Sequence, residues 1–463
     1  MTDRRSMSKS KDARIRELEA EVAELKALLA KALARIAQLE KNSRTSSKPP
    51  SSDITKPPSP GKSGGGGSRG KRSAGGQKGH TRNPRPPFTD DQIDQRFDYD
   101  FAPGSKPGDQ WERLDDFYIH QQAELRDNPL IITEHRFVRY RHKITGRIIN
   151  APPPEGLKAQ GMFGPRLRAL TATLKGELHA SYRGMQRLYQ DALGLPVSTG
   201  YLAKVVAQSS DALASPYESL CSALADETVL NLDETGHPDR GERYWLWAAI
   251  AKTFSVFRID KSRGSQVVEQ LLGLAYQGVL GSDFFSAYRK FVKDHPACLP
   301  AYCWAHLIRE VRYLTTLSDK ATANWASKLL NAIKRLFKAY HTQGAKAQAN
   351  AKEAILKCVR RPPKRGETVT LANRIKQHKD AYFLFLARDE VEPTNNIAER
   401  ALRHGVMHRK LTQGTRGDTG QRWLERMLSV RATCQQQERS FFGYLVQAIE
   451  AHANGRPSPE LMA

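Results

Sequence analysis

The sequence predicts an α/β protein whose sheet lies in the C-terminal half of the chain. Three observations lead to this prediction. The chain has 463 residues, more than one domain of typical size. Its apolar residues follow a heptad near the N-terminus, and from residue 226 they form short β-type runs that alternate with helical segments. A stretch dominated by Pro, Ser and Gly separates the heptad from the rest.

The chain is strongly basic. Lys and Arg number 73 against 49 Asp and Glu, which gives a formal net charge of +24. Such an excess favours a polyanionic partner, because each cation placed on a phosphate releases condensed counterions. Generic solubility is the alternative, but acidic surfaces serve that purpose as well. We therefore expect nucleic acid as the partner.

The five cysteines are odd in number and scattered, and no secretory signal is recognisable at the N-terminus. This pattern is typical of a reducing, cytoplasmic compartment. No run of about 18 apolar residues is present. The sequence therefore predicts no membrane span.

Residues 11–41 are predicted to form a coiled-coil helix. Apolar residues recur there in alternating steps of three and four, and charged residues fill most other positions. The helix cannot bury so narrow a stripe alone, which favours a homodimer or higher oligomer; packing on the chain's own body is the alternative. The predicted seam consists of Ile15, Leu18, Val22, Leu25, Leu29, Ile36 and Leu39.

Residues 42–87 are rich in Pro, Ser and Gly, and Asp53 is their single acid among many Lys and Arg. A segment of this composition cannot bury enough apolar surface to fold by itself, so we expect a flexible basic arm. Basic arms add salt-dependent DNA affinity that is independent of sequence. A plain linker is the alternative, but a linker does not require this charge.

Residues 88–160 are predicted to form a small mixed β region. Short β-type runs occur at 117–119 and 130–142, and the second carries basic residues on alternate positions. No cysteine precedes Cys221, so we expect no zinc ligands in this region.

Residues 161–220 are predicted to be helical. One helix is expected over 182–193, and after a short turn at 195–197 a second helix begins at Gly200. This outline is that of a helix-turn-helix that reads DNA, although any pair of packed helices gives the same pattern. Both interpretations remain open.

Residues 221–453 are predicted to form the largest domain, with an α/β sheet. Three strands, a helix and two further strands are expected, which is the order of a ribonuclease-H-like sheet. A helical insertion at about 307–390 follows, and the C-terminal part from Asn395 is helical again. The expected strands cover 228–233, 244–251, 254–259, 278–283 and 299–304, and the helix covers 265–272.

Two aspartates are expected where apolar strands end, Asp233 and Asp283. Taken singly, a strand-end Asp is more often a turn former. Adjacent strand ends bring such carboxylates together, however, and Glu399 from a later helix can complete the site. Three carboxylates offer the hard oxygen ligands that two Mg²⁺ ions take, with Mn²⁺ as a substitute. Two such ions support in-line displacement at a phosphate.

Glu399 is expected on a helix that Asn395 can cap. An ion-paired surface helix is one interpretation, and a metal-binding carboxylate beside phosphate-binding cations is the other. The predicted apolar side of the helix consists of Ile397, Ala401, Leu402 and Val406. The candidate phosphate-binding residues on it are Arg400, Arg403 and Lys410.

His306 is expected to begin a helix near these carboxylates and to orient them or a phosphate. Arg309 and Arg312 lie three and six residues further on, and contact with DNA and simple exposure are equally compatible with them. Cys298, Cys303 and His306 lack a convincing fourth zinc ligand. We therefore expect no zinc, and we expect Cys303 to be a buried thiol.

Several short motifs run through the chain: Asp233-Glu-Thr-Gly, Tyr244-Trp-Leu-Trp, Gly278-Val-Leu-Gly-Ser-Asp283, Cys303-Trp-Ala-His306 and Asn395-Asn-Ile-Ala-Glu399-Arg. Together they resemble the motif series of DDE transposases of the insertion sequence 66 family. Asn42-Ser-Arg-Thr-Ser-Ser-Lys-Pro-Pro-Ser-Ser-Asp and Gly75-Gly-Gln-Lys-Gly-His are similar to the arm of that family, and the heptad fits its leucine-zipper region.

The resemblance implies that Asp233, Asp283 and Glu399 are the metal-binding triad of a bacterial, nucleoid-associated enzyme. It implies magnesium-dependent strand cleavage and strand transfer at the ends of an insertion element. Transposon-end DNA, target DNA and accessory proteins of the same element would be the partners.

Two departures stand against the resemblance. Relatives usually carry Cys-x-x-Cys pairs before the helical region, and this chain has none there. Thr394 stands where an Asp commonly precedes the paired Asn, and Glu392 is the nearest acid that can compensate.

Two other functions are compatible with the sequence. One is a nuclease of the same fold that cuts DNA without transposition, and the other is a non-enzymatic DNA-binding regulator derived from a transposase. Joining of a cleaved 3′ end to a target duplex separates a transposase from the first. Magnesium-dependent nicking of end DNA separates it from the second.

Overall fold

The computed structural model describes residues 87–101, 118–127, 129–152 and 161–462. The predicted coiled-coil helix at 11–41 and nearly all of the basic arm at 42–87 lie outside the described residues. Both therefore stay predictions. The described residues fall into two compact units, one of 161–181 and 200–462 and one of 87–101, 118–127, 129–152 and 182–199.

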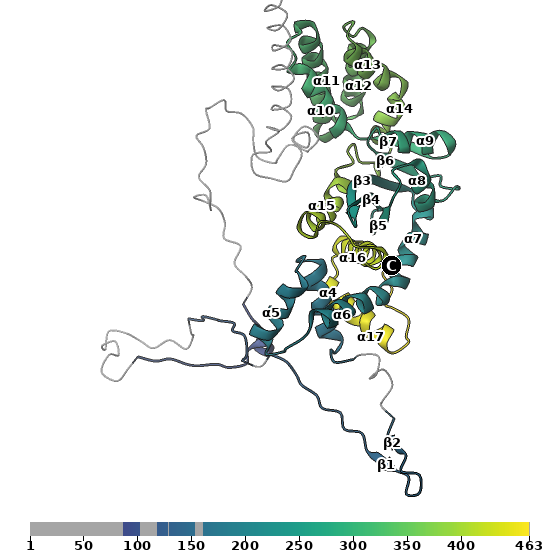
Figure 1. Ribbon diagram of the computed structural model, residues 1–463. Coiled ribbons are helices and arrows are strands. Elements are labelled where there is room, and N and C mark those ends of the chain that lie inside the picture. Colours follow the sequence, from purple (N-terminus) through teal and green to yellow (C-terminus); the bar gives the residue numbers. More distant parts are fainter. Residues whose placement is uncertain (1–86, 102–117, 128, 153–160, 463) are drawn as a thin grey trace, which may run out of the picture. The chain divides into compact units, whose positions relative to one another are not determined.

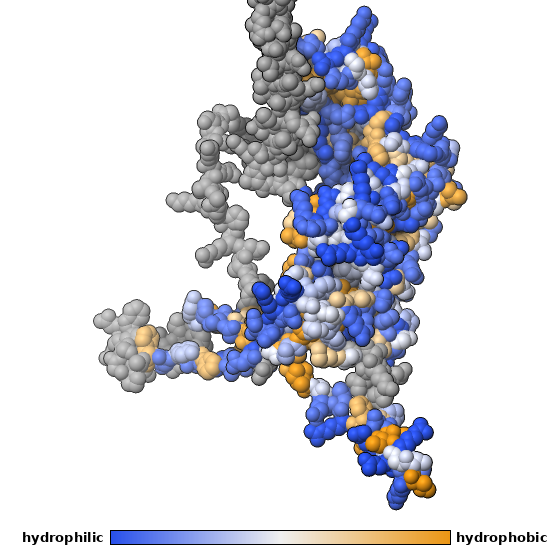
Figure 2. Space-filling view, viewed as in Figure 1, coloured by the Kyte–Doolittle hydropathy of each residue, from blue (hydrophilic) through white to orange (hydrophobic). Residues whose placement is uncertain are grey.

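The smaller unit contains a short antiparallel hairpin. β1 (Arg139–Arg141) pairs with β2 (Ile148–Asn150), and Tyr140 is opposite Ile149. Every strand residue is exposed, and Figure 2 shows hydrophobic side chains on the surface of this hairpin. Because a two-stranded ribbon gains little from burial, the pairing is short.

The strand prediction for this region is only partly confirmed. β1 lies within the predicted run at 130–142, but residues 131–138 form no strand, and neither do Tyr118 and Ile119. Their β-type composition does not suffice, because no sheet within the described residues offers them a packed face. The unit also holds a 3-10 turn (Asp90–Gln92) and helix α5 (Tyr182–Leu193).

The larger unit begins with helices. These are α4 (Pro165–Gly176), α6 (Thr199–Ala212) and α7 (Ala214–Ala223), followed by a 3-10 turn (Leu224–Asp226). Helices therefore form where the sequence predicts them. Because α5 and nearly all of α6 belong to different units, the helix-turn-helix stays a prediction.

A mixed five-stranded sheet follows, in the order β5-β4-β3-β6-β7. β4 runs antiparallel to β3 and β5, whereas β6 and β7 run parallel to β3 (Figure 1). The predicted α/β class is thereby confirmed. The strands are β3 (Val229–Asp239), β4 (Glu242–Ile250), β5 (Ser255–Asp260), β6 (Val279–Ser282) and β7 (Leu299–Tyr302).

Two helices connect the later strands. α8 (Ser265–Leu272) precedes β6, as predicted, and α9 (Ser286–Asp294) lies between β6 and β7. α9 was not predicted from the sequence. It has only nine residues, and Ala287, Tyr288 and Phe291 are buried, so it is shorter than the stretch of about 11 to 18 residues over which a helical period is recognised.

β3 is longer than predicted. The sequence placed Asp233 at the end of the strand, but β3 continues to Asp239. The extension is polar and is held by pairing with β4, which reaches from Asn231 to Asp239. A tight turn at Arg240 and Gly241, both with positive φ, closes this hairpin. Pairing, and not apolar character, therefore sets the length of β3.

The sheet is covered on both faces at its centre. Leu246 to Ile250 of β4 are buried without a break, and successive strand residues point to opposite faces. α15 (Asn396–Thr412) packs on β3 and β4, and α16 (Asp418–Gln436) packs on β5. α17 (Phe441–Ala453) packs on α4 and α16.

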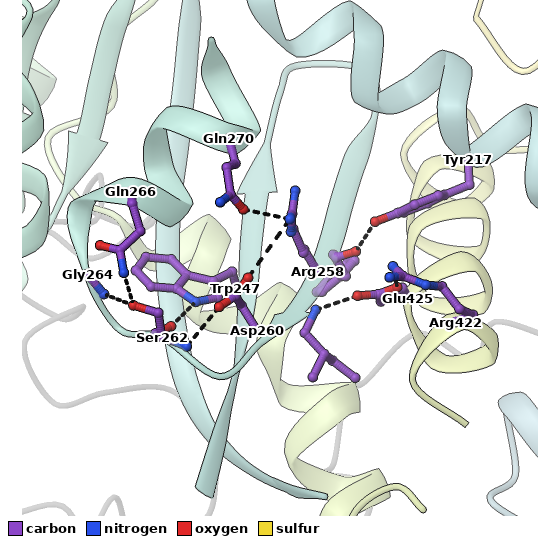
Figure 3. A network of polar contacts seen from close by, with 12 residues as sticks. Tyr217, Trp247, Arg258, Asp260, Ser262, Gly264, Gln266, Gln270, Arg422 and Glu425 are labelled. Carbon is purple, nitrogen blue, oxygen red and sulfur yellow. Dashed lines mark hydrogen bonds and ion pairs between the residues drawn. The ribbon is translucent and has the colours of Figure 1, made fainter. Parts of the chain in front are cut away.

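Side chains of α16 occupy the backbone donors of the edge strand β5. Acceptors four residues apart lie on one face of the helix, so successive acceptors meet successive alternate residues of the strand. The pairs are Ile259 N to Glu425 (2.7 Å), Phe257 N to Ser429 (2.8 Å) and Ser255 N to Thr433 (3.1 Å). Figure 3 shows Glu425 in this network, where it also holds Arg422 at 2.8 Å.

Helices fill the chain between β7 and α15. Their core is centred on Trp304, which is fully buried and contacts Phe337 and Phe383 edge-on. A 3-10 turn (Leu384–Leu386) ends the group. The helices are α10 (Trp304–Thr315), α11 (Lys320–Thr342), α12 (Ala345–Arg360), α13 (Gly366–Gln377) and α14 (Lys379–Tyr382).

The two ends of this helical segment meet. The Trp304 amide donates to the carbonyl of Pro393 at 3.0 Å, and the Asn395 amide donates to Cys303 Sγ at 3.1 Å. The chain thus leaves the sheet and returns to it at one place. No helix of the described residues is long and apolar enough to cross a membrane.

Candidate active site

Asp233 lies on β3, and Asp283 directly follows the neighbouring parallel strand β6. The ladder between β3 and β6 ends with Asn231 opposite Gly281. Each aspartate lies two residues beyond this pair, and residues two apart on a strand share a face. The carboxyl end of β6 therefore brings Asp283 beside Asp233, even though β3 itself continues.

The carboxyl group of Asp233 lies among other acids. Its burial, followed by the negative charges of Glu234, Asp283 and Glu399, raises the pKa of Asp233 to about 8. The Glu234 amide donates to Asp233 Oδ1 at 3.0 Å, which opposes this shift. The structure therefore brings the three predicted carboxylates within electrostatic reach of one another.

Asn395 connects α15 to β3 beside this cluster. Asn395 is the N-cap residue of α15, as predicted, but its side chain makes no capping hydrogen bond. Its Nδ2 donates instead to the carbonyl of Leu232 at 2.6 Å, one residue before Asp233. Asn395 is 2% exposed and faces the sheet, so its amide bonds a strand carbonyl and not the helix start.

Cys303 takes part in the same junction. It is buried, as predicted, and its Sγ accepts the Asn395 amide. Burial raises the pKa of Cys303 to about 11, so the side chain stays a neutral thiol near pH 7.

Glu399 is paired with residues of α10. Arg309 Nη2 lies 2.6 Å from Glu399 Oε1, and His306 Nε2 lies 3.6 Å from the same oxygen. Burial and the charge of Arg309 lower the pKa of His306, and Glu399 opposes them. Two of the predicted DNA-contacting residues therefore converge on a carboxylate. Arg312 is half-buried further along α10.

The remaining candidate cations lie on the exposed side of α15. Arg400, Arg403 and Lys410 are all exposed. The predicted apolar side was only partly right, since Leu402 is buried but Ile397, Ala401 and Val406 are half-buried. A glycine and a histidine contribute to the buried side, which a search for apolar residues does not detect. It consists of Asn396, Ala398, Leu402, Gly405 and His408.

A cavity of about 200 Å³ opens beside Asp283. Arg374 of α13 lines it, with Nη2 at 2.6 Å from Glu310 Oε2 and its guanidinium 5.0 Å from the centre of the Phe284 ring. The helices after β7 therefore reach the residue that follows Asp283. The cavity is lined by Asp283, Phe284, Phe285, Cys303, His306, Leu307, Glu310, Arg374 and Tyr382.

Glu234 is a further carboxylate at this edge of the sheet, and it was not among the predicted site residues. Its side chain is 2% exposed and is paired with Arg263, whose Nη2 lies 2.7 Å from Glu234 Oε1. The hydroxyl of Tyr288 donates to Glu234 Oε2. The acid directly after Asp233 was a visible signal, but its partners are 29 and 54 residues away in the chain.

The donor set suits a hard divalent cation by its chemistry. Asp233, Asp283 and Glu399 supply carboxylate oxygens. Burial, followed by the charges of Glu234, Asp283 and Glu399, raises the pKa of Asp233, and a bound cation would oppose this shift. Among the described residues, no group of three or more His, Cys, Asp or Glu side chains is already arranged around a metal position. In this arrangement Glu399 is directed to Arg309.

Two protein-family models match this chain. The family model described as "Transposase IS66 family" matches residues 160–422, more than half of the chain and the part that carries all three carboxylates. A second model, "Family of unknown function (DUF6444)", matches residues 7–86.

One curated relative is the "Uncharacterized protein y4qI" of Sinorhizobium fredii (strain NBRC 101917 / NGR234), 24% identical over 268 residues. The match covers 52% of this chain and 49% of that protein, so the chain spans about half the length of the relative. The match of the family model over 160–422 shows that the chain belongs to the IS66 family of transposases.

Proposed function

We propose that this protein is a transposase that cleaves DNA at the ends of an insertion element and transfers the cut strands to target DNA. Asp233, Asp283 and Glu399 act as its DDE triad. The geometry that carries the proposal is that Asp233 and Asp283 each lie two residues beyond the last pair of the ladder between β3 and β6, and that Asn395, four residues before Glu399, bonds the carbonyl of Leu232 beside Asp233. The pKa of Asp233, raised by its burial and then by the charges of Glu234, Asp283 and Glu399, agrees with this placement. Three of these four acids are the ones that the family motifs assign.

The sheet supports a ribonuclease-H-like catalytic domain. In the order β5-β4-β3-β6-β7, the first three strands are antiparallel and the last two run parallel to β3. Asp233 and Asp283 lie at the end of the parallel ladder, and α15 supplies Glu399 from a later part of the chain. This is the order in which the sequence predicts the triad.

Asp233, Asp283 and Glu399 would hold Mg²⁺ or Mn²⁺. A divalent cation held there would supply Lewis-acid chemistry, which would polarise a phosphate oxygen and lower the pKa of the attacking water or hydroxyl. For Glu399 to serve as a ligand, its oxygen must be shared with or released by Arg309. A released Arg309 guanidinium then faces the same space and can bind a phosphate oxygen.

The exposed cations of α15, Arg400, Arg403 and Lys410, are proposed to hold flanking phosphates of the transposon end. A helix-turn-helix in 161–220 would read the end sequence, the basic arm at 42–87 would add non-specific affinity, and the coiled coil at 11–41 would join protomers. Each assignment extends a sequence prediction to the proposed activity.

The test is a pair of substitutions in the full-length protein, Asp233→Asn and Glu399→Gln. Both are expected to abolish magnesium-dependent cleavage and strand transfer on end-sequence duplexes while end binding by gel shift is retained. Glu390→Gln changes an exposed acid and is the control, with wild-type activity expected.

Other outcomes decide against the proposal. A triad variant with full strand transfer would remove these residues from the mechanism. Wild-type protein that nicks ends but never joins a 3′ end to target DNA is a nuclease. Wild-type protein that binds ends without nicking them is a regulator.

A further inference from the structure

Glu234 has both of its carboxylate oxygens occupied. Oε1 accepts from Arg263 Nε at 2.9 Å and from Arg263 Nη2 at 2.7 Å, and Oε2 accepts from the Tyr288 hydroxyl. The side chain is 2% exposed. An acid in this state is not free to bind a metal, although it follows Asp233 directly in the chain.

The Arg263 guanidinium is held by aromatic rings as well as by its hydrogen bonds to Glu234. Its guanidinium carbon lies 4.3 Å from the centre of the Trp245 ring and 4.0 Å from the centre of the Phe285 ring. A planar guanidinium between two rings is oriented by them, and its fork then meets the carboxylate in one geometry. A lysine can supply the charge at this place but not the fork or the stacking.

These contacts run from one catalytic aspartate to the other. Glu234 is the residue after Asp233, whereas Phe285 and Tyr288 lie two and five residues after Asp283. The Phe285 amide also donates to Asp283 Oδ1 at 2.9 Å. Two links therefore join the neighbours of Asp233 to the neighbours of Asp283, one through Arg263 and Phe285 and one through Tyr288.

We propose that Glu234, Arg263 and Tyr288 are positioning residues that hold the carboxylates of Asp233 and Asp283 at the separation that the metal ions require. The proposal rests on the proposed function of these aspartates. The two carboxylates repel each other, and β3 and the segment after β6 share no backbone pairing beyond Asn231 and Gly281. The side-chain links oppose that repulsion where the backbone ladder has ended.

The chain offers a matched control in Glu425. It is also a buried glutamate, 0% exposed, with an arginine partner, Arg422, at 2.8 Å and a backbone donor, Ile259 N, at 2.7 Å (Figure 3). It joins α16 to β5 and is not among the acids that act on Asp233. Glu425→Gln therefore reports what the loss of a buried Glu–Arg pair does to the fold alone.

The experiment uses full-length protein bound to end-sequence duplex. Mn²⁺ binding is measured by electron paramagnetic resonance of the free ion, and single-turnover cleavage is measured against Mn²⁺ concentration. Glu234→Gln and Arg263→Lys are expected to raise the Mn²⁺ concentration at half-saturation by about 10- to 100-fold in both measurements. Their affinity for end DNA should remain that of wild type. Glu425→Gln should lower the thermal midpoint and leave Mn²⁺ binding unchanged.

Each outcome decides the proposal. If Glu234→Gln and Arg263→Lys bind Mn²⁺ as wild type does, the residues are merely structural and the proposal is overturned. If Asp233→Asn binds as much Mn²⁺ as wild type does, Asp233 holds no metal. The proposed function then fails, and the positioning role fails with it. If Glu234→Gln does not fold, Tyr288→Phe takes its place, because it removes the hydroxyl link to Glu234 and keeps the ring. It should also raise the Mn²⁺ concentration at half-saturation.

Discussion

At the scale of single residues, His408 is a buried imidazole whose neighbours are basic. Its ring centre lies 5.6 Å from that of His179, which in turn lies 4.5 Å from His404. Burial first, and then the charges of His179 and Lys175, lower the pKa of His408 to about 3. Burial and Arg409 lower the pKa of His237 to about 4, against the charge of Asp239. Both imidazoles are therefore neutral in the folded protein.

This cluster predicts a loss of stability in acid. A histidine in the unfolded chain titrates near pH 6.5, so below that pH the unfolded state takes up protons that the folded state excludes. The contribution of these two imidazoles to the free energy of unfolding is fully present above pH 6.5. It is lost as the pH falls to about 3 to 4, where the imidazoles of the folded protein are also protonated. At pH 5 we expect about 2 kcal/mol of loss from His408 alone.

The measurement is urea unfolding at pH 7.5 and pH 5 for wild type, His408→Gln and His452→Gln. His408→Gln should show a smaller fall between the two pH values, whereas His452→Gln, at an exposed position, should fall as wild type does. An equal fall in all three proteins would show that the buried imidazole is not the cause.

The residues of the candidate site also differ in how far the sequence predicts their contacts. That Asp283 and Glu399 lie near Asp233 could be predicted, because acids next to apolar strands, and an acid on a later helix, are visible in the chain itself. The side-chain tie of Asn395 to Leu232 and the partners of Glu234 could not. Each of these contacts depends on which residues the folded sheet brings together across long stretches of chain.

At the scale of elements, α15 positions Glu399 through a close approach to the sheet. A Cβ on Gly405 would lie 2.3 Å from Leu246 Cδ2, and Leu246 is fully buried on β4. At this point the helix lies so near to the sheet that a residue with a Cβ atom would clash with Leu246.

We expect Gly405→Ala to destabilise the protein by about 1 to 2 kcal/mol, because overpacking outweighs the gain in helix propensity. Gly420→Ala on α16 is the matched control, since its Cβ would meet only ordinary contacts of 3.5 Å or more and should be neutral or stabilising. Thermal unfolding measures both. Addition of Leu246→Ala should make Gly405→Ala less costly, and a Gly405→Ala protein as stable as Gly420→Ala would contradict the close approach.

The order of strands was predictable because five apolar runs and one amphipathic helix are separated by turn residues. The length of β3 was not, because its polar half is held by pairing with β4, which no local pattern reveals. α9 was missed because its nine residues are fewer than the stretch over which a helical period is usually recognised.

At the scale of the whole molecule, the net charge of +24 predicts DNA binding that weakens steeply with salt. The basic arm should carry part of this dependence. Replacing Lys71, Arg72, Lys78 and Arg82 by Gln is expected to reduce the slope of log K against log salt by about 3 to 4, because each phosphate that a cation neutralises adds about 0.9 to the slope.

Fluorescence anisotropy with a labelled duplex at several salt concentrations measures this slope. The control replaces Ser46, Ser47, Ser51 and Ser52 by Gln, which changes the same arm without removing charge. An unchanged slope in the Lys and Arg variant would mean that the arm is a linker.

The junction of Cys303, Trp304, Pro393 and Asn395 has a consequence for how such proteins diversify. Because the two ends of the helical segment are hydrogen-bonded neighbours, a connection of a few residues would suffice to join β7 to α15. Helices α11 to α13 can therefore lengthen or shorten in evolution, whereas α10 and α14 share a buried core with Ala301 and Tyr302 of β7. Arg309, which pairs with Glu399, is the cation that loss of α10 would remove from the carboxylates, so a relative without this helix has to supply a cation from elsewhere.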